Sequence, residues 1–335
     1  MPISPSSAIV AVLLAVSAPA AELTPDGALA LAIGDPSSGY SGRAVTTRWY
    51  GDKARSSEYR IFYMPPDRYR REYLTPQGAT KAVSVSDGDR EWIYFPRKGK
   101  AVTGDAVKSV EKNLDDAAEA ALLHENYSIA LSTGDPIAGR EAWSLILVPK
   151  SAGKSRQTFA IDKQTGAVLE SRRFQPEGGL AVLFKFNRFQ PGPQPLDRFV
   201  LPPATSTSTA NQLDPDYMTL AELDKALGEP SNFPARLPGG FVFESGDLLT
   251  VGKNPVGLAR YTDGLAVLSI FRTKKPVKIP RGMTEAGGGS TSALRLSAVG
   301  HVLGVTKGGR HYTFVGDVSA ALLSSIGAEF TKAPN

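Results

Sequence analysis

Apolar and polar residues alternate with a period of two along most of this chain, which is the pattern of β-strands. The clearest case is the segment 58–64, where Tyr59, Ile61 and Tyr63 share one side. Similar runs predict further strands at 45–50, 68–74, 81–86, 91–95, 143–148, 157–162, 168–174, 180–186, 241–244, 258–261, 266–272, 301–307 and 310–315. The dipeptide Asp87-Gly88 between two of these runs is typical of a β-hairpin, so antiparallel sheets are expected.

Helical signals are few. Thr24 precedes a short helical pattern as a cap, and Thr219 with Glu222 forms a capping box in front of another. The longest predicted helix covers 105–123, where apolar residues recur at steps of three and four. A last short helix is predicted after Asp317. The chain therefore has more strand than helix available to build its cores.

Some strands are apolar on both sides, notably at 92–95 and 145–148. An antiparallel sheet with one face in water should alternate instead, so either both faces are packed or one face lines an apolar cavity. Because long helices are scarce, a curved sheet with lid helices would satisfy the pattern, although an ordinary packed core would do so too. The residues chosen as lining a lipid-binding cavity are Trp49, Ile61, Tyr63, Tyr73, Trp92, Tyr94, Leu145 and Leu147. A slip of one residue would turn each strand over, so this choice of face is a hypothesis.

The expected fold class is thus α+β. It combines a curved antiparallel β-sheet, shaped as a half-barrel with lid helices, with a smaller C-terminal α/β sheet domain. A length of 335 residues agrees with two domains. The predicted first domain covers 22–188, a linker rich in Pro, Ser and Thr covers 189–216, and the second domain covers 217–335.

The N-terminal segment has the pattern of a signal peptide. The apolar run 8–16 is too short to span a bilayer, and Ala18-Pro19-Ala20 fits a cleavage site. Residues 1–21 are therefore predicted to be removed near Ala20/Ala21, and the mature protein is expected to be exported.

Composition removes several classes of chemistry. There is no cysteine, so disulfides, thiol catalysis and iron–sulfur clusters are excluded. The three histidines do not stand at metal-ligand spacing, and the chain has no nucleophile elbow or phosphate-binding loop. No cofactor, no metal and no enzymatic activity are expected.

The net charge of +5 is mild and includes no Lys/Arg run of the nucleic-acid-binding type. The basic residues of the second domain were instead considered as a surface for an acidic segment of a protein partner, with solvated strand ends as the alternative. These partner-binding candidates, all expected to be exposed, are Arg260, Arg272, Lys274 and Lys275.

Several short motifs, in this order and at these distances, resemble the RseB/MucB family of sigma-E regulatory proteins. In the first domain they include Tyr40-Ser41-Gly42-Arg43, the segment 87–96 and the segment 161–170. In the second domain they include 237–241 and 261–271. Each motif is weak alone, and together they cover nearly the whole mature chain.

This resemblance implies a first domain similar to the LolA and LolB lipoprotein carriers and a periplasmic protein without catalytic residues. It implies binding to the periplasmic domain of a membrane-spanning anti-sigma factor, release by lipid or lipopolysaccharide acyl chains, and a homodimer as one oligomeric form. A periplasmic lipid or lipoprotein carrier of the LolA/LolB type is the alternative function. An envelope enzyme is a third, which the missing catalytic motifs disfavour.

Overall fold

The structure is a computed structural model. It describes residues 23–50, 53–105, 114–201, 204, 206–209, 217, 219–251, 254–274, 284–285, 292–296, 300–307 and 309–330. The predicted signal peptide and Lys275 lie outside the described residues.

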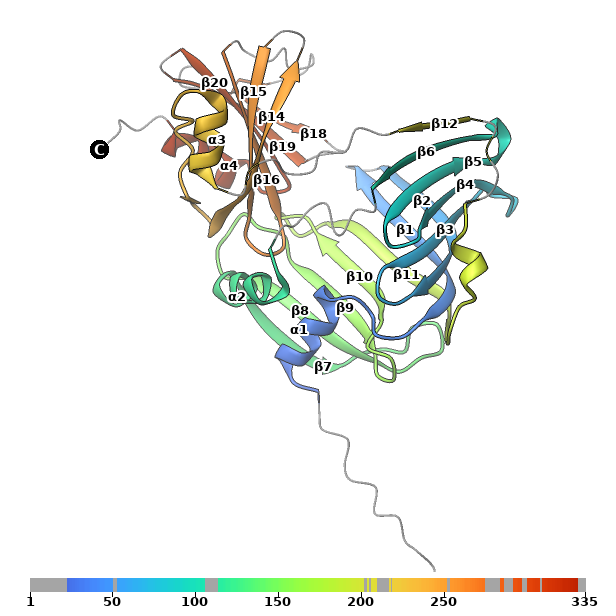
Figure 1. The fold of residues 1–335 in the computed structure, drawn as a ribbon. Coiled ribbons are helices and arrows are strands. Elements are labelled where there is room, and N and C mark those ends of the chain that lie inside the picture. Colours follow the sequence, from blue (N-terminus) through green and yellow to red (C-terminus); the bar gives the residue numbers. More distant parts are fainter. Residues whose placement is uncertain are drawn as a thin grey trace, which may run out of the picture.

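The first domain is built on one large curved sheet (Figure 1). Its twelve described strands lie in the order β12-β6-β5-β4-β3-β2-β1-β11-β10-β9-β8-β7. Neighbours pair antiparallel, except for the parallel pair β12 and β6. The strand bounds are β1 Tyr40–Tyr50, β2 Lys53–Met64, β3 Arg68–Leu74, β4 Thr80–Ser86, β5 Arg90–Phe95, β6 Lys100–Asp105, β7 Tyr127–Thr133, β8 Ala142–Pro149, β9 Gln157–Asp162, β10 Val168–Phe174, β11 Leu180–Pro191 and β12 Ser206–Thr209.

Two helices, α1 (Pro25–Ile33) and α2 (Asp116–Asn126), pack on one face of this sheet at β7, β8 and β9. The hydroxyl of Thr24 accepts a hydrogen bond from the backbone N of Gly27, which fixes the start of α1 as the sequence predicts. We call the helix-bearing face of the sheet the inner face and the opposite face the outer face. The expected α+β class with a curved sheet and lid helices is confirmed.

The predicted helix over 105–123 begins in the wrong place. Asp105 closes strand β6 and pairs with Arg90 of β5, and α2 starts only at Asp116. The side chain of Asp115 caps this helix by accepting a hydrogen bond of 2.7 Å from the backbone N of Ala118. Residues 106–113 lie outside the described part of the chain. The apolar periodicity predicts a helix from Asp105 onward, but pairing with β5 holds Asp105 in a strand. No local sequence pattern shows this pairing.

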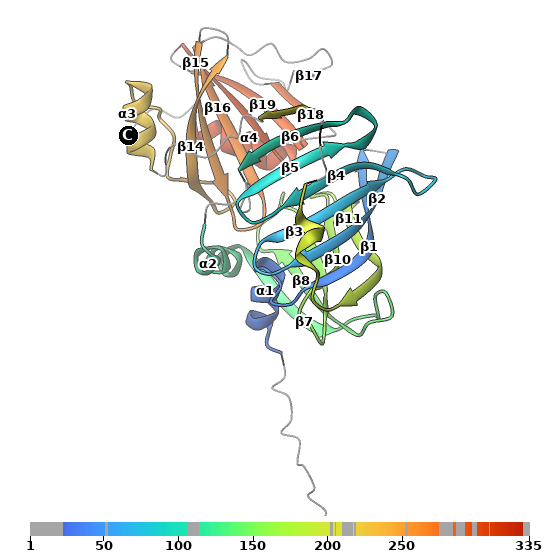
Figure 2. The ribbon, with the colours of Figure 1, turned by 45° about the vertical axis from the view of Figure 1, so that its right-hand side comes forward.

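The second domain has its own sheet of eight described strands, in the order β13-β14-β15-β16-β20-β19-β18-β17. The helices α3 (Leu220–Leu227) and α4 (Ala320–Glu329) pack against it (Figure 2). The capping box of Thr219 and Glu222 forms as predicted, while α4 is capped by Ser319 rather than Asp317. The strand bounds are β13 Arg236–Leu237, β14 Phe241–Val251, β15 Asn254–Thr262, β16 Val267–Thr273, β17 Thr284–Glu285, β18 Ser292–Leu296, β19 Gly300–Lys307 and β20 Arg310–Gly316.

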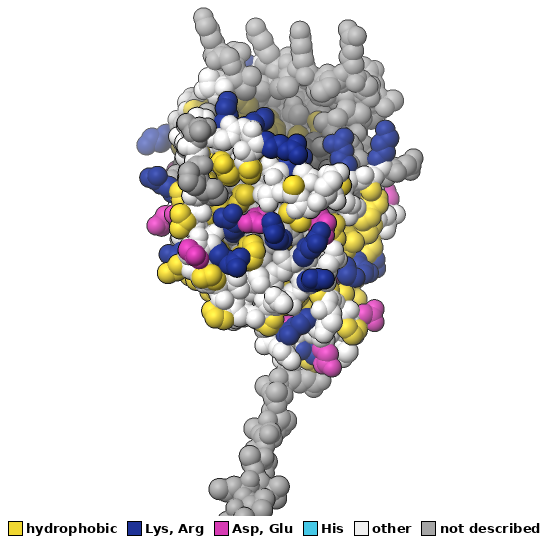
Figure 3. Space-filling view, turned by 90° about the vertical axis from the view of Figure 1, so that its right-hand side faces the viewer, with side chains coloured by type: hydrophobic (Ala, Val, Ile, Leu, Met, Phe, Trp, Pro, Cys, Tyr) yellow, Lys and Arg dark blue, Asp and Glu magenta, His cyan; other side chains and the backbone are white. Residues whose placement is uncertain are grey.

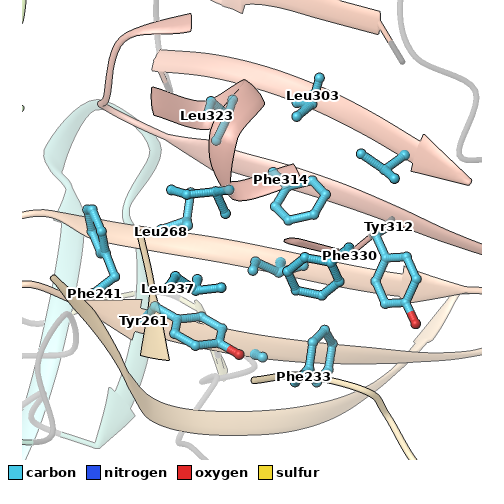
Figure 4. Close-up of a cluster of buried hydrophobic side chains, with 14 of the residues drawn as sticks. Phe233, Leu237, Phe241, Tyr261, Leu268, Leu303, Tyr312, Phe314, Leu323 and Phe330 are labelled. Carbon is cyan, nitrogen blue, oxygen red and sulfur yellow. The ribbon is translucent and has the colours of Figure 1, made fainter. Parts of the chain in front are cut away.

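A dense aromatic and aliphatic core holds this domain together (Figure 4). Phe330, which follows α4, lies edge-on against Phe314 with ring centroids 5.0 Å apart, and it also contacts Phe233 and Tyr312. Aromatic pairs in such arrangements add to the stabilisation that burial itself provides. The last helix is therefore anchored to the sheet at its C-terminal end.

The two domains meet at the hairpin turn between β15 and β16. Asp263 in this turn is completely buried, and its Oδ1 accepts hydrogen bonds from the backbone N of Leu265 and Ala266. Its Oδ2 accepts a hydrogen bond of 2.8 Å from the hydroxyl of Tyr127 and lies 3.2 Å from Nζ of Lys154, both in the first domain. A turn that the sequence indicates only as a hairpin is therefore the centre of the domain interface.

The buried ammonium group of Lys154 has several further partners. Its Nζ donates to Oδ1 of Asn126 and to the carbonyl of Gly239, and it lies 4.8 Å from the ring centroid of Tyr127. Gly240 has a positive φ of 80°, and an added Cβ would come within 1.8 Å of the Asn126 side chain. Glycine is thus required for the second domain to approach the first this closely.

We predict that Lys154→Met lowers the free energy of unfolding by about 3–5 kcal/mol, because it leaves the buried Asp263 carboxylate without its cation. The double variant Lys154→Met/Asp263→Asn should be less destabilised than Lys154→Met, since no unpaired charge then remains. Urea unfolding followed by circular dichroism measures both effects.

Lys150→Met is the matched control for this prediction. Lys150 is exposed and donates only to the carbonyl of His124, so its loss should change stability by about 0.5 kcal/mol or less. If Lys154→Met unfolds at the same urea concentration as the wild type, the ion pair does not hold the domains together.

Candidate functional site

The inner face of the first domain carries a largely buried layer of aromatic side chains over β1, β2, β3 and β11, in which Tyr59, Tyr63, Phe186 and Phe189 are at most 7% exposed. We call this layer the aromatic surface. The β2 alternation places Tyr59, Ile61 and Tyr63 on this face, and the strand register carries the face to Tyr73 and Arg71 of β3. Each of these positions is therefore set by the two-residue period and by antiparallel pairing.

The rings of this surface stack on one another. Tyr40 lies 5.1 Å from Tyr63 in a stacked arrangement and 5.1 Å from Phe189, while Phe186 meets Phe189 edge-on. Tyr59 and Tyr73 face each other across β2 and β3, with their centroids 5.5 Å apart. Most of these rings are therefore packed in a core, and Tyr40 and Tyr73 are its half-buried members.

Buried hydroxyls anchor this surface. The hydroxyl of Tyr63 donates to the carbonyl of Pro66 at 2.7 Å, and the hydroxyls of Tyr59 and Thr46 share a hydrogen bond of 2.7 Å. Burial raises the pKa of Tyr40 to about 12, an effect that the charge of Arg71 partly opposes. Tyr40 is therefore neutral at physiological pH, and the exposed Arg71 supplies positive charge on this face.

The predicted cavity residues are divided among three places. Ile61, Tyr63 and Tyr73 lie on the aromatic part of the inner face. Leu145 and Leu147 share the inner face, but they are completely buried beneath the helices in a core with Leu29 and Leu123.

The remaining predicted residues lie on the opposite side of the sheet. Glu72 pairs with Val83, and Val83 pairs with Tyr94, so Tyr94 lies on the outer face together with Trp92. The half-buried Trp49 at the end of β1 lies on the outer face as well. The structure thus brings three of the eight residues together at one surface. Their role in lipid binding stays a prediction.

Other members of the aromatic surface were absent from the predicted set. The alternation in the sequence places Tyr59 on the same face as Ile61 and Tyr63. By the same period, Arg71 shares a face with Tyr73, but the predicted set includes only Tyr73. A consistent use of the two-residue period would have added these. Phe186 and Phe189 come from β11, whose position beside β1 no local pattern gives.

The outer-face residues Trp92 and Tyr94 are covered by part of the predicted linker. After β11, the short helix η2 (Leu196–Phe199) places Phe199, which is 3% exposed, against Val83 and Val85. Ser206–Thr209 then adds β12 to the sheet beside β6. Parts of 189–216 are therefore attached to the first domain.

The predicted partner-binding residues have different surroundings. Lys274 is exposed and Arg260 is half-buried. Arg272 was expected to be exposed, but its side chain is only 5% exposed because it is enclosed beside Glu229, to which it is ion-paired. Figure 3 looks onto the first domain instead, where Lys and Arg side chains are interspersed with apolar, acidic and uncharged ones.

Among the described residues, no group of three or more His, Asp and Glu side chains is arranged to hold a metal ion. In the same part of the chain, no helix combines the length and the apolar character needed to cross a membrane.

These features define a two-domain protein with an aromatic layer on the sheet of one domain, which contacts a second sheet domain through buried polar groups. No protein-family model and no curated protein sequence matches the chain. Solved structures do match. MucB in complex with MucA(peri) is 19% identical over 89% of this chain and 94% of that chain, with a TM-score of 0.58. The Pseudomonas aeruginosa MucA/MucB complex is 19% identical over 90% and 96%, with a TM-score of 0.59.

A LolA superfamily protein from Nitrosomonas europaea is 9% identical over 52% of this chain and 94% of that chain, with a TM-score of 0.27. The two MucB complexes extend over both domains, so the chain has an RseB/MucB-like fold. The resemblance that the sequence motifs indicated is confirmed at the level of the fold.

We predict that Phe199→Ala lowers the free energy of unfolding by about 3–5 kcal/mol, because Phe199 fills the outer-face core between the sheet and η2. Leu196→Ala in the same helix is the control, since Leu196 is 63% exposed and should contribute about 0.5 kcal/mol or less. Chemical unfolding measures both variants, and equal stabilities would show that η2 is not part of the folded domain.

Proposed function

We propose that this chain is a periplasmic negative regulator of envelope-stress signalling that binds the periplasmic part of a membrane-spanning anti-sigma factor. The observation that supports this is the match over about nine-tenths of both chains with MucB, which was solved in complex with MucA(peri). The proposed role is that of a binding protein and requires no catalytic residue.

The two-domain architecture favours regulation over transport. A carrier needs only a surface for its cargo, which the first domain alone would supply. Here a second domain is held against the first by a completely buried ion pair between Lys154 and Asp263, so the chain presents both domains as one unit. A protein partner can contact such a unit on both domains at once.

The aromatic inner face supports a second part of the proposal, the sensing of lipid. Tyr40 and Tyr73 at this layer are only half-buried, and the exposed Arg71 lies beside Tyr69 with its guanidinium 5.4 Å from the ring centroid. A lipid with an anionic head group would satisfy both features. If lipid prefers the partner-free form, lipid and partner weaken each other's binding by the same factor.

The test is a pull-down with the mature protein, residues 22–335, from an envelope extract, followed by a binding titration with the purified periplasmic segment of the recovered protein. We expect a small single-span protein to be recovered, and to be lost when lipopolysaccharide is added. Recovery of many acylated proteins instead would favour the alternative, a periplasmic lipid or lipoprotein carrier.

We predict that Arg71→Gln binds the anti-sigma segment like the wild type but needs a several-fold higher lipopolysaccharide concentration to release it, because the inner face loses the exposed cation beside its aromatic residues. Arg188→Gln, which removes an exposed cation from the outer face, is the control and should release the segment like the wild type. Equal release curves for all three proteins would exclude Arg71 from lipid sensing.

A further inference from the structure

A small pocket in the second domain lies where α3 ends beside the edges of β15, β16 and β20. Its cavity volume is about 30 Å³, and it is open to solvent. Its lining combines cationic side chains with one carboxylate and an apolar wall, formed by Leu227, Glu229, Pro255, Arg272, Thr273, Lys274 and Arg310. This pocket includes two of the predicted partner-binding residues and adds Arg310.

The charges in the pocket do not balance. Glu229 is the one carboxylate among the described lining residues, and it faces three cations. Its Oε1 lies 3.2 Å from Nη2 of Arg272, and its Oε2 accepts a hydrogen bond from Arg310. Loss of contact with water would raise the pKa of Glu229, but Arg272 and Arg310 outweigh that effect and lower it. Glu229 is therefore ionised, and the pocket keeps an excess of positive charge.

Arg272 has a hydrogen-bond donor that the described residues leave unused. Its side chain is 5% exposed, and Nη2 also donates to the carbonyl of Pro230 at 3.1 Å. Its Nε is buried and has no hydrogen-bond partner. A buried donor on a charged group is costly when it is left unpaired, so an acceptor from outside the chain would be favourable here.

We propose that this pocket receives the carboxylate of an acidic side chain of the protein partner. The inference rests on the proposed function and names the chemistry by which the second domain would take part in it. A carboxylate oxygen is a strong acceptor for a guanidinium N–H, and Nε of Arg272 is the donor that Glu229 and Pro230 leave available. Leu227 and Pro255 provide apolar contacts for the methylene groups that carry a glutamate or aspartate carboxylate.

The apolar wall and the small size distinguish this ligand from a phosphate. A phosphate would place an oxygen against Leu227 or Pro255, whereas a side-chain carboxylate presents polar atoms at one end only. The internal Glu229 is itself a carboxylate bound by the same two arginines, so the pocket already accommodates this group. A partner carboxylate would share these cations with Glu229.

Removing the charge of Arg310 and removing the charge of Glu229 should change partner affinity in opposite directions, and this difference tests the proposal. In a titration with the anti-sigma periplasmic segment, Arg310→Gln should weaken binding roughly tenfold, because a charged hydrogen-bond donor is lost. Glu229→Gln should strengthen binding several-fold, because a competing negative charge is removed. The control Lys225→Gln removes an exposed cation on α3 outside the pocket and should change little.

A merely structural role of the network would produce another result. In that case Glu229→Gln would weaken binding as much as Arg310→Gln, and this outcome would overturn the proposal. Thermal unfolding of each variant identifies effects that come from loss of folding, and Glu229→Asp, which keeps the charge, should behave close to the wild type.

A second measurement separates this inference from the proposed function. N-acetylglutamate amide is titrated into the intact mature protein, and the arginine Nε–H signals are followed by NMR. A saturable shift that is absent in Arg310→Gln supports the carboxylate site even if the anti-sigma segment does not bind. The absence of any saturable shift in the wild type overturns the site, whatever the segment does.

Discussion

The buried contact between Lys154 and Asp263 is the interaction on which the two-domain structure depends. Moving two charges out of water is costly, and that cost is offset only when every remaining donor and acceptor is satisfied. Here both oxygens of Asp263 and the ammonium group of Lys154 have partners from both domains. The hydrogen-bond geometry is specific, so the ion pair selects one arrangement of the domains as well as stabilising it.

In this arrangement the two domains carry different kinds of side chains at their candidate sites. The first domain has a largely buried layer of aromatic rings on its inner face, with the exposed Arg71 beside it. The second presents a compact cationic pocket beside α3. The aromatic layer and the charged pocket differ in chemistry and share no residue.

Much of the first sheet could be predicted from the sequence because its strands follow the two-residue period closely. The inward positions of Ile61, Tyr63 and Tyr73 follow from that period together with pairing. Trp92 and Tyr94 were assigned to the wrong side because their segment is apolar on both faces, and only the register with β4 decides which face is which. Local patterns contain no information about such long-range pairing.

The domain interface was beyond prediction for a similar reason. Asp263-Gly264 is an ordinary turn signal, and nothing in the neighbouring residues indicates that its carboxylate enters another domain beside Lys154. The sequence predicts an exposed Arg272, and this prediction is wrong because Glu229, 43 positions earlier in the chain, encloses the Arg272 side chain. Secondary structure is largely a local property, whereas burial of a charge depends on residues far away in the chain.

The parallel pairing of β12 with β6 has a consequence for how the chain could be divided. An uncovered strand edge presents free backbone donors and acceptors to other chains, and proteins normally protect such edges. In this molecule the protection of β6 is supplied by Ser206–Thr209, well beyond the last long strand of the sheet. A first domain cut off at Arg188 would lose that cover together with Phe199, and would be prone to self-association through the bared edge.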